Sequence, residues 1–250
     1  MDFIGKHKKV SMKVLILAGG LGKRVASFSD NKPKCMLKVQ DKPFLEYLVR
    51  HLIIEGLSNQ IFLIGHKAND IIEYFGDGRR FSANILYSVD EQLTGTAGAL
   101  KNCEHFLGDE VFFVINGDTY TKIKFARMYR QHKDQNAQAT ICISKRDLSK
   151  GKELNNYAGI NINKDNEVLS YSEKSSGDYI GCGTYLFDGT IFQYLQKGIN
   201  SSLEYNLIPT LLENHHRISS YLYKGPLFDI GTPERFSKFS KFIGNKNGCN

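Results

Sequence analysis

Residues 13–24 read Lys-Val-Leu-Ile-Leu-Ala-Gly-Gly-Leu-Gly-Lys-Arg. The run Lys13–Leu17 predicts a fully buried strand, because a stretch that is apolar on both faces needs cover on both sides. The turn that follows, Gly19-Gly20-Leu21-Gly22, would let backbone N–H groups approach an anion closely. Arg24 and, further on, Lys34 would add the positive charge that phosphate oxygens require.

This glycine turn matches neither common phosphate-binding signature, G-x-x-x-x-G-K-[ST] or G-x-G-x-x-G. A plain tight turn therefore stays open as the alternative interpretation of the same residues. The missing third glycine also disfavours a dinucleotide-dependent oxidoreductase.

Beyond the turn, short apolar runs alternate with amphipathic stretches. The predicted strands of the first half are Lys13–Leu17, Gln60–Ile64, Asn84–Ser88 and Val111–Ile115, and its predicted helices are Phe44–Glu55, Asp70–Phe75 and Thr96–Cys103. This alternation predicts an α/β fold of the doubly wound, Rossmann-like kind, with a mixed, mostly parallel sheet flanked by helices. In such sheets ligands bind beyond the carboxyl ends of the strands, where the Gly19 turn and the Asn116-Gly117-Asp118 turn are expected.

The second half is predicted to be richer in strands. These are Ala139–Ser144, Gly159–Ile162, Glu167–Ser172, Gly183–Phe187 and Ile218–Leu222, with helices at Gly189–Leu195 and Ser202–Glu213. We therefore expect a smaller, β-rich part after about residue 140.

Composition limits the class of protein. With 250 residues, 41% hydrophobic and 24% charged, the chain has the make-up of an ordinary globular protein. The net charge of +7 permits nucleic acid, anionic membrane or phosphate-rich small molecules as partners. Five scattered cysteines without a C-x-x-C pair exclude a disulfide framework and favour a reducing cytoplasm. The run Val14–Ala18 is too short for a signal peptide or a membrane span, so we expect a cytoplasmic protein.

The stretch Leu17–Lys34 resembles the signature of the sugar-phosphate nucleotidylyltransferases (NDP-sugar pyrophosphorylases), an L-A-G-G-x-G-T-R-L run followed by P-K-P. Further blocks that resemble this family follow in order: Pro43-Phe44-Leu45-Glu46-Tyr47, Gly95-Thr96-Ala97-Gly98-Ala99, Asn116-Gly117-Asp118, Glu173-Lys174 and Phe228-Asp229-Ile230-Gly231-Thr232-Pro233. Together they span residues 13 to about 236. The early blocks are most similar to the D-glycero-alpha-D-manno-heptose 1-phosphate guanylyltransferase branch.

The resemblance implies an enzyme that joins a sugar 1-phosphate to a nucleoside triphosphate and releases pyrophosphate, for surface polysaccharide precursors. It implies GTP and a heptose or mannose-type sugar, with cytidylyl, uridylyl or thymidylyl transfer as the alternative. The implied catalytic residues are Arg24, Lys34 and Asp118, and the implied Mg²⁺ ligands are Asp118 and Asp229. The implied nucleotide-binding residues are Leu17, Ala18, Gly19, Gly20, Gly22, Gly95, Thr96, Ala97 and Gly117, and the implied sugar-phosphate contacts are Gly159, Glu173, Lys174, Gly183 and Glu204.

Physical chemistry supports the two aspartates independently. Transfer from a triphosphate requires charge neutralisation, and Mg²⁺ usually takes one or two carboxylates together with phosphate oxygens and water. Asp229 lies between Phe228 and Ile230, where a buried carboxylate is costly without a partner, and a metal ion would be such a partner. Two other interpretations stay open: Asp118 would cap its own turn, and Asp229 would cap a helix that starts at Pro233.

The chain departs from the family pattern at several positions: Lys23 for Thr, Val25 for Leu, Cys35 for the second proline, Leu93-Thr94 for Pro-Leu, and Gly181 for Asn. Gly181 cannot supply an amide to a sugar, so sugar specificity stays open.

The resemblance also implies the domain organisation and the partners. Residues 12–243 would form one domain, with a nucleotide-binding half (12–138) and a sugar-phosphate-binding half (139–243) between an N-terminal extension (1–11) and a flexible tail (244–250). The expected partners are the two substrates, without nucleic acid or membrane, and a homo-oligomer is left open. The competing classes are a non-catalytic nucleotide-binding paralogue and a basic module that binds phosphate or nucleic acid.

Overall fold

The computed structural model describes residues 12–20, 32–65, 67–90, 92–147, 157–172 and 177–247. The chain forms two compact units. Unit 1 takes Met1–Gln92, Ile115–Lys122 and Pro226–Asn250, and unit 2 takes Leu93–Val114 and Ile123–Gly225. The chain thus leaves unit 1 and returns to it twice.

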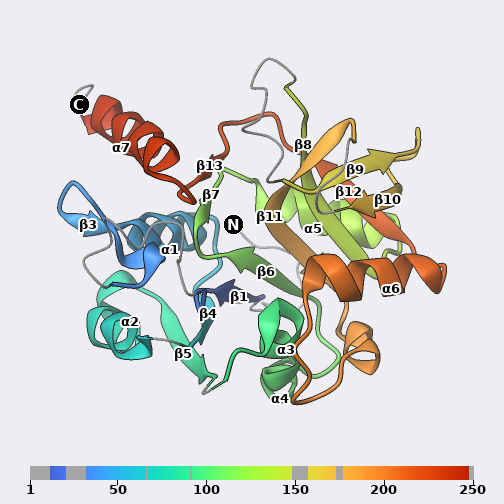
Figure 1. The fold of residues 1–250 in the computed structure, drawn as a ribbon, viewed down its shortest axis with the longest axis horizontal. Helices are drawn as coiled ribbons and strands as arrows, with labels where there is room; N and C mark the ends of the chain where they lie inside the picture. Colours follow the sequence, from blue (N-terminus) through green and yellow to red (C-terminus); the bar gives the residue numbers. More distant parts are fainter. Residues whose placement is uncertain are drawn as a thin grey trace, which may run out of the picture. The chain divides into compact units, whose positions relative to one another are not determined.

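The sheet of unit 1 is parallel. Its strands β1 (Lys13–Leu17), β4 (Asn59–Ile64) and β5 (Asn84–Val89) lie side by side in that order (Figure 1). The central residues of β1 are fully buried, as the apolar run predicts. Helices α1 (Phe44–Ile54) and α2 (Ala68–Phe75) follow β1 and β4 in the chain, and each packs its apolar side inward. A crossover helix between parallel strands is the arrangement that the sequence pattern predicted.

Smaller elements complete unit 1. These are the 3₁₀ turns η2 (Lys34–Met36) and η3 (Arg79–Phe81), the hairpin of β2 (Lys38–Val39) with β3 (Lys42–Pro43), the antiparallel pair of β7 (Thr119–Tyr120) with β13 (Phe228–Asp229), and the C-terminal helix α7 (Pro233–Asn247). Phe239 of α7 is fully buried against Phe44 of α1 and Tyr120 of β7, with ring centroids 4.7 and 5.2 Å apart. These aromatic contacts anchor α7 beside the β7–β13 pair.

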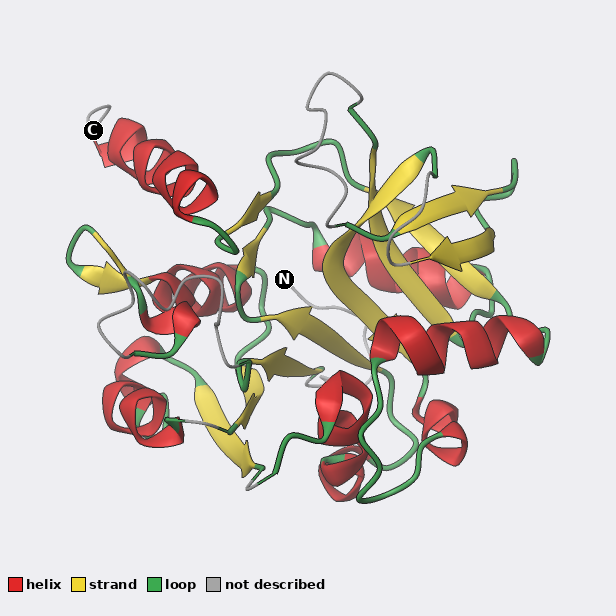
Figure 2. Cartoon of the chain, in the orientation of Figure 1, coloured by secondary structure: helices red, strands yellow, loops and turns green. Residues whose placement is uncertain are grey.

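Unit 2 is built around β8 (Ala139–Lys145). It pairs antiparallel with β11 (Tyr179–Phe187) and parallel with β12 (Ile218–Leu222), and Figure 2 shows these strands together with helix α5 (Phe125–Asp134) packed against them. The remaining elements of unit 2 are β9 (Gly159–Ile162), β10 (Val168–Ser172), α3 (Gly95–Asn102), α4 (Glu104–Leu107), η5 (Gly189–Tyr194), the π-helical turn η6 (Leu203–Leu207) and α6 (Ile208–Glu213). Strand β6 (Phe112–Asn116) has residues in both units.

The order of the predicted strands and helices is confirmed, and most of their ends agree within two residues. Strand β11 starts at Tyr179 rather than Gly183, and β6 is shifted by one residue. The segment predicted as a helix over Gly189–Leu195 is a 3₁₀ helix, and the one predicted over Ser202–Glu213 starts as a π-helical turn. The α/β fold class is therefore the predicted one.

The domain boundaries differ from the predicted ones. The expected division at residue 138 does not coincide with either unit, because the chain re-enters unit 1 after Gly225 to pair β13 with β7. Residues 244–247, predicted as a flexible tail, belong to α7, where buried Ile243 joins the cluster around Phe239. Within the described part of the chain, no helix is long and apolar enough to cross a membrane.

Candidate functional site

Asp118 and Asp229, far apart in the sequence, are neighbours in unit 1. The antiparallel register pairs Asp229 of β13 with Thr119 of β7, and Ile230 donates its N–H to the Asp118 carbonyl at 3.0 Å. Strand pairing therefore brings the two predicted metal ligands to one place. This juxtaposition was predicted only through the family resemblance, because strands of two residues carry too weak a pattern to be recognised.

Lys34 lies between the two carboxylates. Its Nζ donates to Asp118 Oδ2 at 2.6 Å and is 3.8 Å from Asp229 Oδ1. The side chain of Lys34 is only 13% exposed, compared with 37% for Asp118 and 20% for Asp229. Three predicted site residues thus form one ion cluster.

Asp229 is held from its other side by Arg235, a residue that the sequence analysis missed. The Nη1 of Arg235 donates to Asp229 Oδ2 at 2.7 Å, and the Gly231 N–H donates to Asp229 Oδ1. Arg235 occupies the first turn of α7 and is 10% exposed. A signal was available, because a cation in the first turn of a helix opposes the helix dipole and calls for a nearby anion.

The alternative in which Asp229 caps helix α7 is wrong. The helix begins at Pro233, and the residue that receives its first N–H groups is Thr232, whose Oγ1 and carbonyl accept from Arg235 and Phe236 at 3.4 and 2.9 Å. Gly231 separates the cap from the ion cluster. A Cβ there would lie 2.7 Å from Asp229 Oδ1, so a side chain would displace the carboxylate.

The two predicted turns at strand ends adjoin each other. Gly117 donates its N–H to the Leu17 carbonyl at 2.9 Å, and a Cβ on Gly117 would lie 2.9 Å from that oxygen. Ala18 donates to Leu63 at the end of β4, while Gly20 is exposed with open space beside it. The beginning of the glycine turn therefore lies next to the Asn-Gly-Asp turn, as predicted; Gly22 and Arg24 lie outside the described residues.

A second group of predicted residues meets in unit 2. The Oγ1 of Thr96 accepts from the Leu203 N–H at 2.8 Å and is 3.4 Å from Glu204 Oε2. Gly95 adopts a φ of 72°, and a Cβ there would lie 2.3 Å from the Ser201 carbonyl. The same carbonyl accepts the Ala97 N–H at 2.9 Å. The predicted nucleotide loop and the predicted sugar-binding Glu204 are thus in direct contact.

Hydroxyl groups fix the Glu204 carboxylate. Tyr185 donates to Oε1 at 3.0 Å, and Ser202 donates to Oε2 at 3.0 Å. Burial, together with the charge of Glu204, raises the pKa of Tyr185 well above its usual range, so its hydroxyl stays a donor. A carboxylate oriented in this way is suited to accepting hydrogen bonds from a polyol.

The remaining predicted sugar contacts either lie on strands of unit 2 or fall outside the described residues. Gly159 begins β9 and pairs with Ile180, and Gly183 lies in the irregular part of β11 with a φ of 63°. Glu173 and Lys174 lie outside the described residues. Gly181 has room for a side chain, because a Cβ there would meet nothing closer than 3.8 Å.

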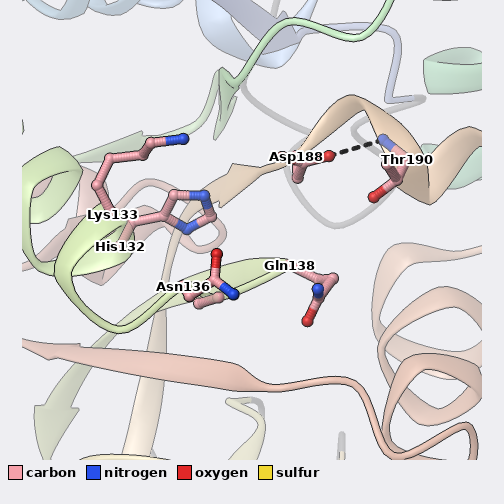
Figure 3. A pocket seen from close by; sticks show the side chains of 7 residues that line it. His132, Lys133, Asn136, Gln138, Asp188 and Thr190 are labelled. Carbon is pink, nitrogen blue, oxygen red and sulfur yellow. Dashed lines mark hydrogen bonds between the residues drawn. The ribbon is translucent and has the colours of Figure 1, made fainter.

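A separate pocket of about 150 Å³ in unit 2 holds none of the predicted residues. Its lining includes His132, Lys133, Gln138 and Asp188, and Figure 3 shows Asp188 accepting from the Thr190 N–H. Burial lowers the pKa of His132 to about 4, so this imidazole is neutral at pH 7. The pocket lacks the charge pattern of the Lys34 cluster, and we assign it no part in the site.

The four described cysteines, Cys35, Cys103, Cys142 and Cys182, are free and buried. Burial, followed by the nearby Asp118 charge, raises the pKa of the Cys35 thiol to about 12. A neutral thiol is a weak nucleophile, so Cys35 is not suited to covalent catalysis.

Residues 13–246 match the nucleotidyl transferase family. The chain is 31% identical over 235 residues to a D-glycero-alpha-D-manno-heptose 1-phosphate guanylyltransferase of Aneurinibacillus thermoaerophilus, covering 92% of this chain and 97% of that relative. It is also 31% identical over 220 residues to a UTP–glucose-1-phosphate uridylyltransferase of Synechocystis, covering 81% of this chain and 56% of that relative.

Among solved structures, HddC from Yersinia pseudotuberculosis, complexed with GMP-PN, has a TM-score of 0.80 and 28% identity to the chain. The similarity covers 93% of this chain and 99% of that one. The likeness therefore extends over nearly the whole chain, and it confirms the fold class.

Proposed function

Because the chain belongs to the nucleotidyl transferase family, we propose that it transfers a guanylyl group from GTP to a heptose or mannose-type 1-phosphate. The products are a GDP-sugar and pyrophosphate. The choice of base and sugar is supported by the heptose 1-phosphate guanylyltransferase relative and by the structural neighbour solved with GMP-PN. We further propose a cytoplasmic role in making sugar donors for surface polysaccharide.

The observation that carries this proposal is the cluster of Lys34, Asp118 and Asp229 in unit 1, close to the start of the glycine turn. Two carboxylates and an ammonium are the groups that a metal-bound triphosphate needs. A turn of exposed glycine backbone beside them suits close approach of phosphate oxygens.

In the proposed reaction, a non-bridging oxygen of the sugar phosphate attacks the α-phosphorus of GTP in line. The bond from that phosphorus to the bridging oxygen breaks, and pyrophosphate leaves with the bonding electrons. The attacking oxygen is already an anion, so no protein nucleophile is needed. Catalysis then consists of positioning and charge neutralisation.

The residues of unit 1 would neutralise charge. Lys34 would leave its carboxylate partners for the triphosphate oxygens, and Arg24 would bind the pyrophosphate. Asp118 and Asp229 fit Mg²⁺, which takes one or two carboxylates and completes its shell with water and phosphate. In the described part of the chain, no group of three or more His, Cys, Asp or Glu side chains gathers. Bound Mg²⁺ would supply Lewis-acid stabilisation of charge on the phosphates.

The residues of unit 2 would bind the sugar. Glu204, held by Tyr185 and Ser202, would accept hydrogen bonds from sugar hydroxyls. Lys174 would hold the sugar phosphate, and Glu173 would bind a sugar hydroxyl. The backbone at Gly159 would pass under the sugar, and Gly183 would also contact this substrate.

The test is a pyrophosphate-release screen of four nucleoside triphosphates against heptose, mannose, glucose and amino-sugar 1-phosphates and phosphocholine. GTP with a heptose or mannose 1-phosphate should be the preferred pair. Preference for UTP would favour the second candidate, uridylyl transfer, which the uridylyltransferase relative supports. Nucleotide binding without pyrophosphate release from any pair would contradict the enzymatic proposal and indicate a non-catalytic paralogue.

A further inference from the structure

We infer that Arg235 is a positioning residue that fixes the Asp229 carboxylate in the orientation required of a divalent-cation ligand. This inference rests on the proposed function, because it concerns the same cation. Arg235 does not touch substrate in this account; it acts through Asp229.

The first argument is the division of the two oxygens of Asp229. The Nη1 of Arg235 binds Oδ2 at 2.7 Å, and the Gly231 N–H binds Oδ1. With one donor on each oxygen, the plane of the carboxylate is set. The Oδ1 atom of Asp229 lies 3.8 Å from Lys34 Nζ. We infer that a divalent cation would bind Oδ1 from this side.

The second argument is the contrast with Asp118. Its Oδ1 accepts from the hydroxyl of Thr119 at 3.2 Å, and its side chain is 37% exposed. The charge-assisted bond to its Oδ2 comes from Lys34, at 2.6 Å, and the proposed function moves this ammonium to the triphosphate. Asp229 is 20% exposed, and its charge-assisted bond comes from Arg235, which keeps its place in that function. Asp229 is therefore the pre-oriented ligand of the pair, and Asp118 is the more adaptable one.

The third argument is the free-energy cost of burying the positive charge of Arg235 at the N-terminal end of a helix. Its side chain is 10% exposed, and the residue lies in the first turn of a 15-residue helix, where the dipole disfavours a cation. The free-energy cost of burying a charge is offset only by a well-placed, hydrogen-bonded group of opposite charge. The helix itself is anchored by Phe239 against Phe44, so Arg235 is presented from a rigid element.

Removal of Arg235 has a defined consequence. Asp229 would keep the Gly231 N–H and would turn its freed oxygen toward Lys34, whose Nζ lies 3.8 Å from Asp229 Oδ1. The carboxylate would then pair with the ammonium instead of the divalent ion. Loss of an outer-shell partner of a metal ligand commonly weakens metal binding by about 10–100-fold.

The experiment compares Arg235→Met, Arg235→Gln and Arg235→Lys with Lys241→Met. Lys241 is exposed on the same helix, so its replacement removes an equal charge without touching Asp229. The primary readout is the Kd of Mn²⁺, measured by electron paramagnetic resonance with a non-hydrolysable GTP analogue present. The second is the Mg²⁺ concentration that gives half-maximal activity, measured separately from the KM for sugar phosphate.

We expect Arg235→Met and Arg235→Gln to raise both cation constants by about 10–100-fold, with the KM for sugar phosphate unchanged. Arg235→Lys should restore part of the affinity, and Lys241→Met should match the wild type. Thermal unfolding shows whether Arg235→Met is folded; if it is not, Arg235→Gln, which keeps a hydrogen-bond donor, decides.

Wild-type Mn²⁺ affinity in a folded Arg235→Gln protein would overturn the inference. Absence of Mn²⁺ binding by the wild type would overturn it too, because no cation ligand would then need positioning. If the wild type binds Mn²⁺ but releases no pyrophosphate with any substrate pair, the proposed function fails, while the Mn²⁺ constants still decide the role of Arg235.

Discussion

The Nζ of Lys34 lies 2.6 Å from Oδ2 of Asp118, at the distance of a charge-assisted hydrogen bond. The ammonium thus occupies the side of Asp118 that faces Asp229. In this arrangement the lysine serves as the counter-cation of two carboxylates that would otherwise repel each other. A divalent ion that arrives with a triphosphate has to take over this role.

Replacement of Lys34 should therefore separate catalysis from cation binding. Lys34→Met should lower kcat by about 10²–10³-fold, the range seen when one charge-stabilising contact is lost. In the absence of nucleotide it should bind Mn²⁺ more tightly than the wild type, because the carboxylates lose their built-in partner. Paired turnover and Mn²⁺ titrations check both effects. Lys38→Met, on an exposed strand residue of the same unit, is the control and should change neither; weaker Mn²⁺ binding in Lys34→Met would contradict this account.

Asp229→Asn should cost both activity and stability. The buried Arg235 would lose its anionic partner, which destabilises a protein by about 1–3 kcal/mol. The double variant Asp229→Asn/Arg235→Met should recover much of that stability but none of the activity, since an uncharged pair needs no compensation. Urea unfolding and pyrophosphate release measure the two quantities. An active Asp229→Asn protein would remove this residue from the cation site.

Gly181→Asn should fold normally and change how sugar phosphates are used. A Cβ at position 181 would lie 3.8 Å from Ile160 Cδ1 and 3.9 Å from the Tyr171 hydroxyl, so the backbone tolerates a side chain. The midpoint of thermal unfolding should stay within a few degrees of the wild type. The KM for sugar 1-phosphate should shift by several-fold while the KM for GTP does not, because the added amide is on strand β11, close in sequence to the predicted sugar contact Gly183. Equal kinetics for every sugar phosphate would show that position 181 does not face the substrate.

Stability should decrease in mild acid because of His132. Burial lowers its pKa from 6.5 to about 4, so the unfolded chain binds a proton on this imidazole more readily than the folded protein does. The contribution of neutral His132 is present above pH 6.5 and is lost as the pH falls toward 4. Unfolding of His132→Gln across this range should show a shallower pH dependence than the wild type. His105→Gln, at an exposed position, is the control and should retain the wild-type slope.

Much of the fold follows from local patterns. Strand β1 is buried because Val14, Leu15 and Ile16 are apolar on both faces, and α1 forms where apolar residues recur at helical spacing from Phe44. The alternation of such segments identified the α/β class without further information. Long or strongly periodic elements carry their own signal, which is why their order and type were predicted correctly.

Only some of the site residues were predicted from the sequence. Asp118, Asp229 and Lys34 were identified from motifs, and the structure brings these three together. Arg235 was missed because its role depends on a partner six residues earlier, across the Gly231 turn, and its place in the first turn of a helix shows only that some anion should lie nearby. The contact of Thr96 with Glu204 was also not predictable from local patterns, since the two residues are 108 positions apart in the sequence.

The amino-acid sequence alone determined the class of fold, the family and the residue types available for chemistry, because these depend on periodicity and on short motifs. Tertiary structure alone decided which charges pair. The two-residue strands β7 and β13 bring Asp118 beside Asp229, helix α7 presents Arg235 to one side of Asp229, and Lys34 lies on the other. Such pairings depend on distances of a few ångströms between remote segments, because Coulombic and hydrogen-bond energies fall off steeply with separation.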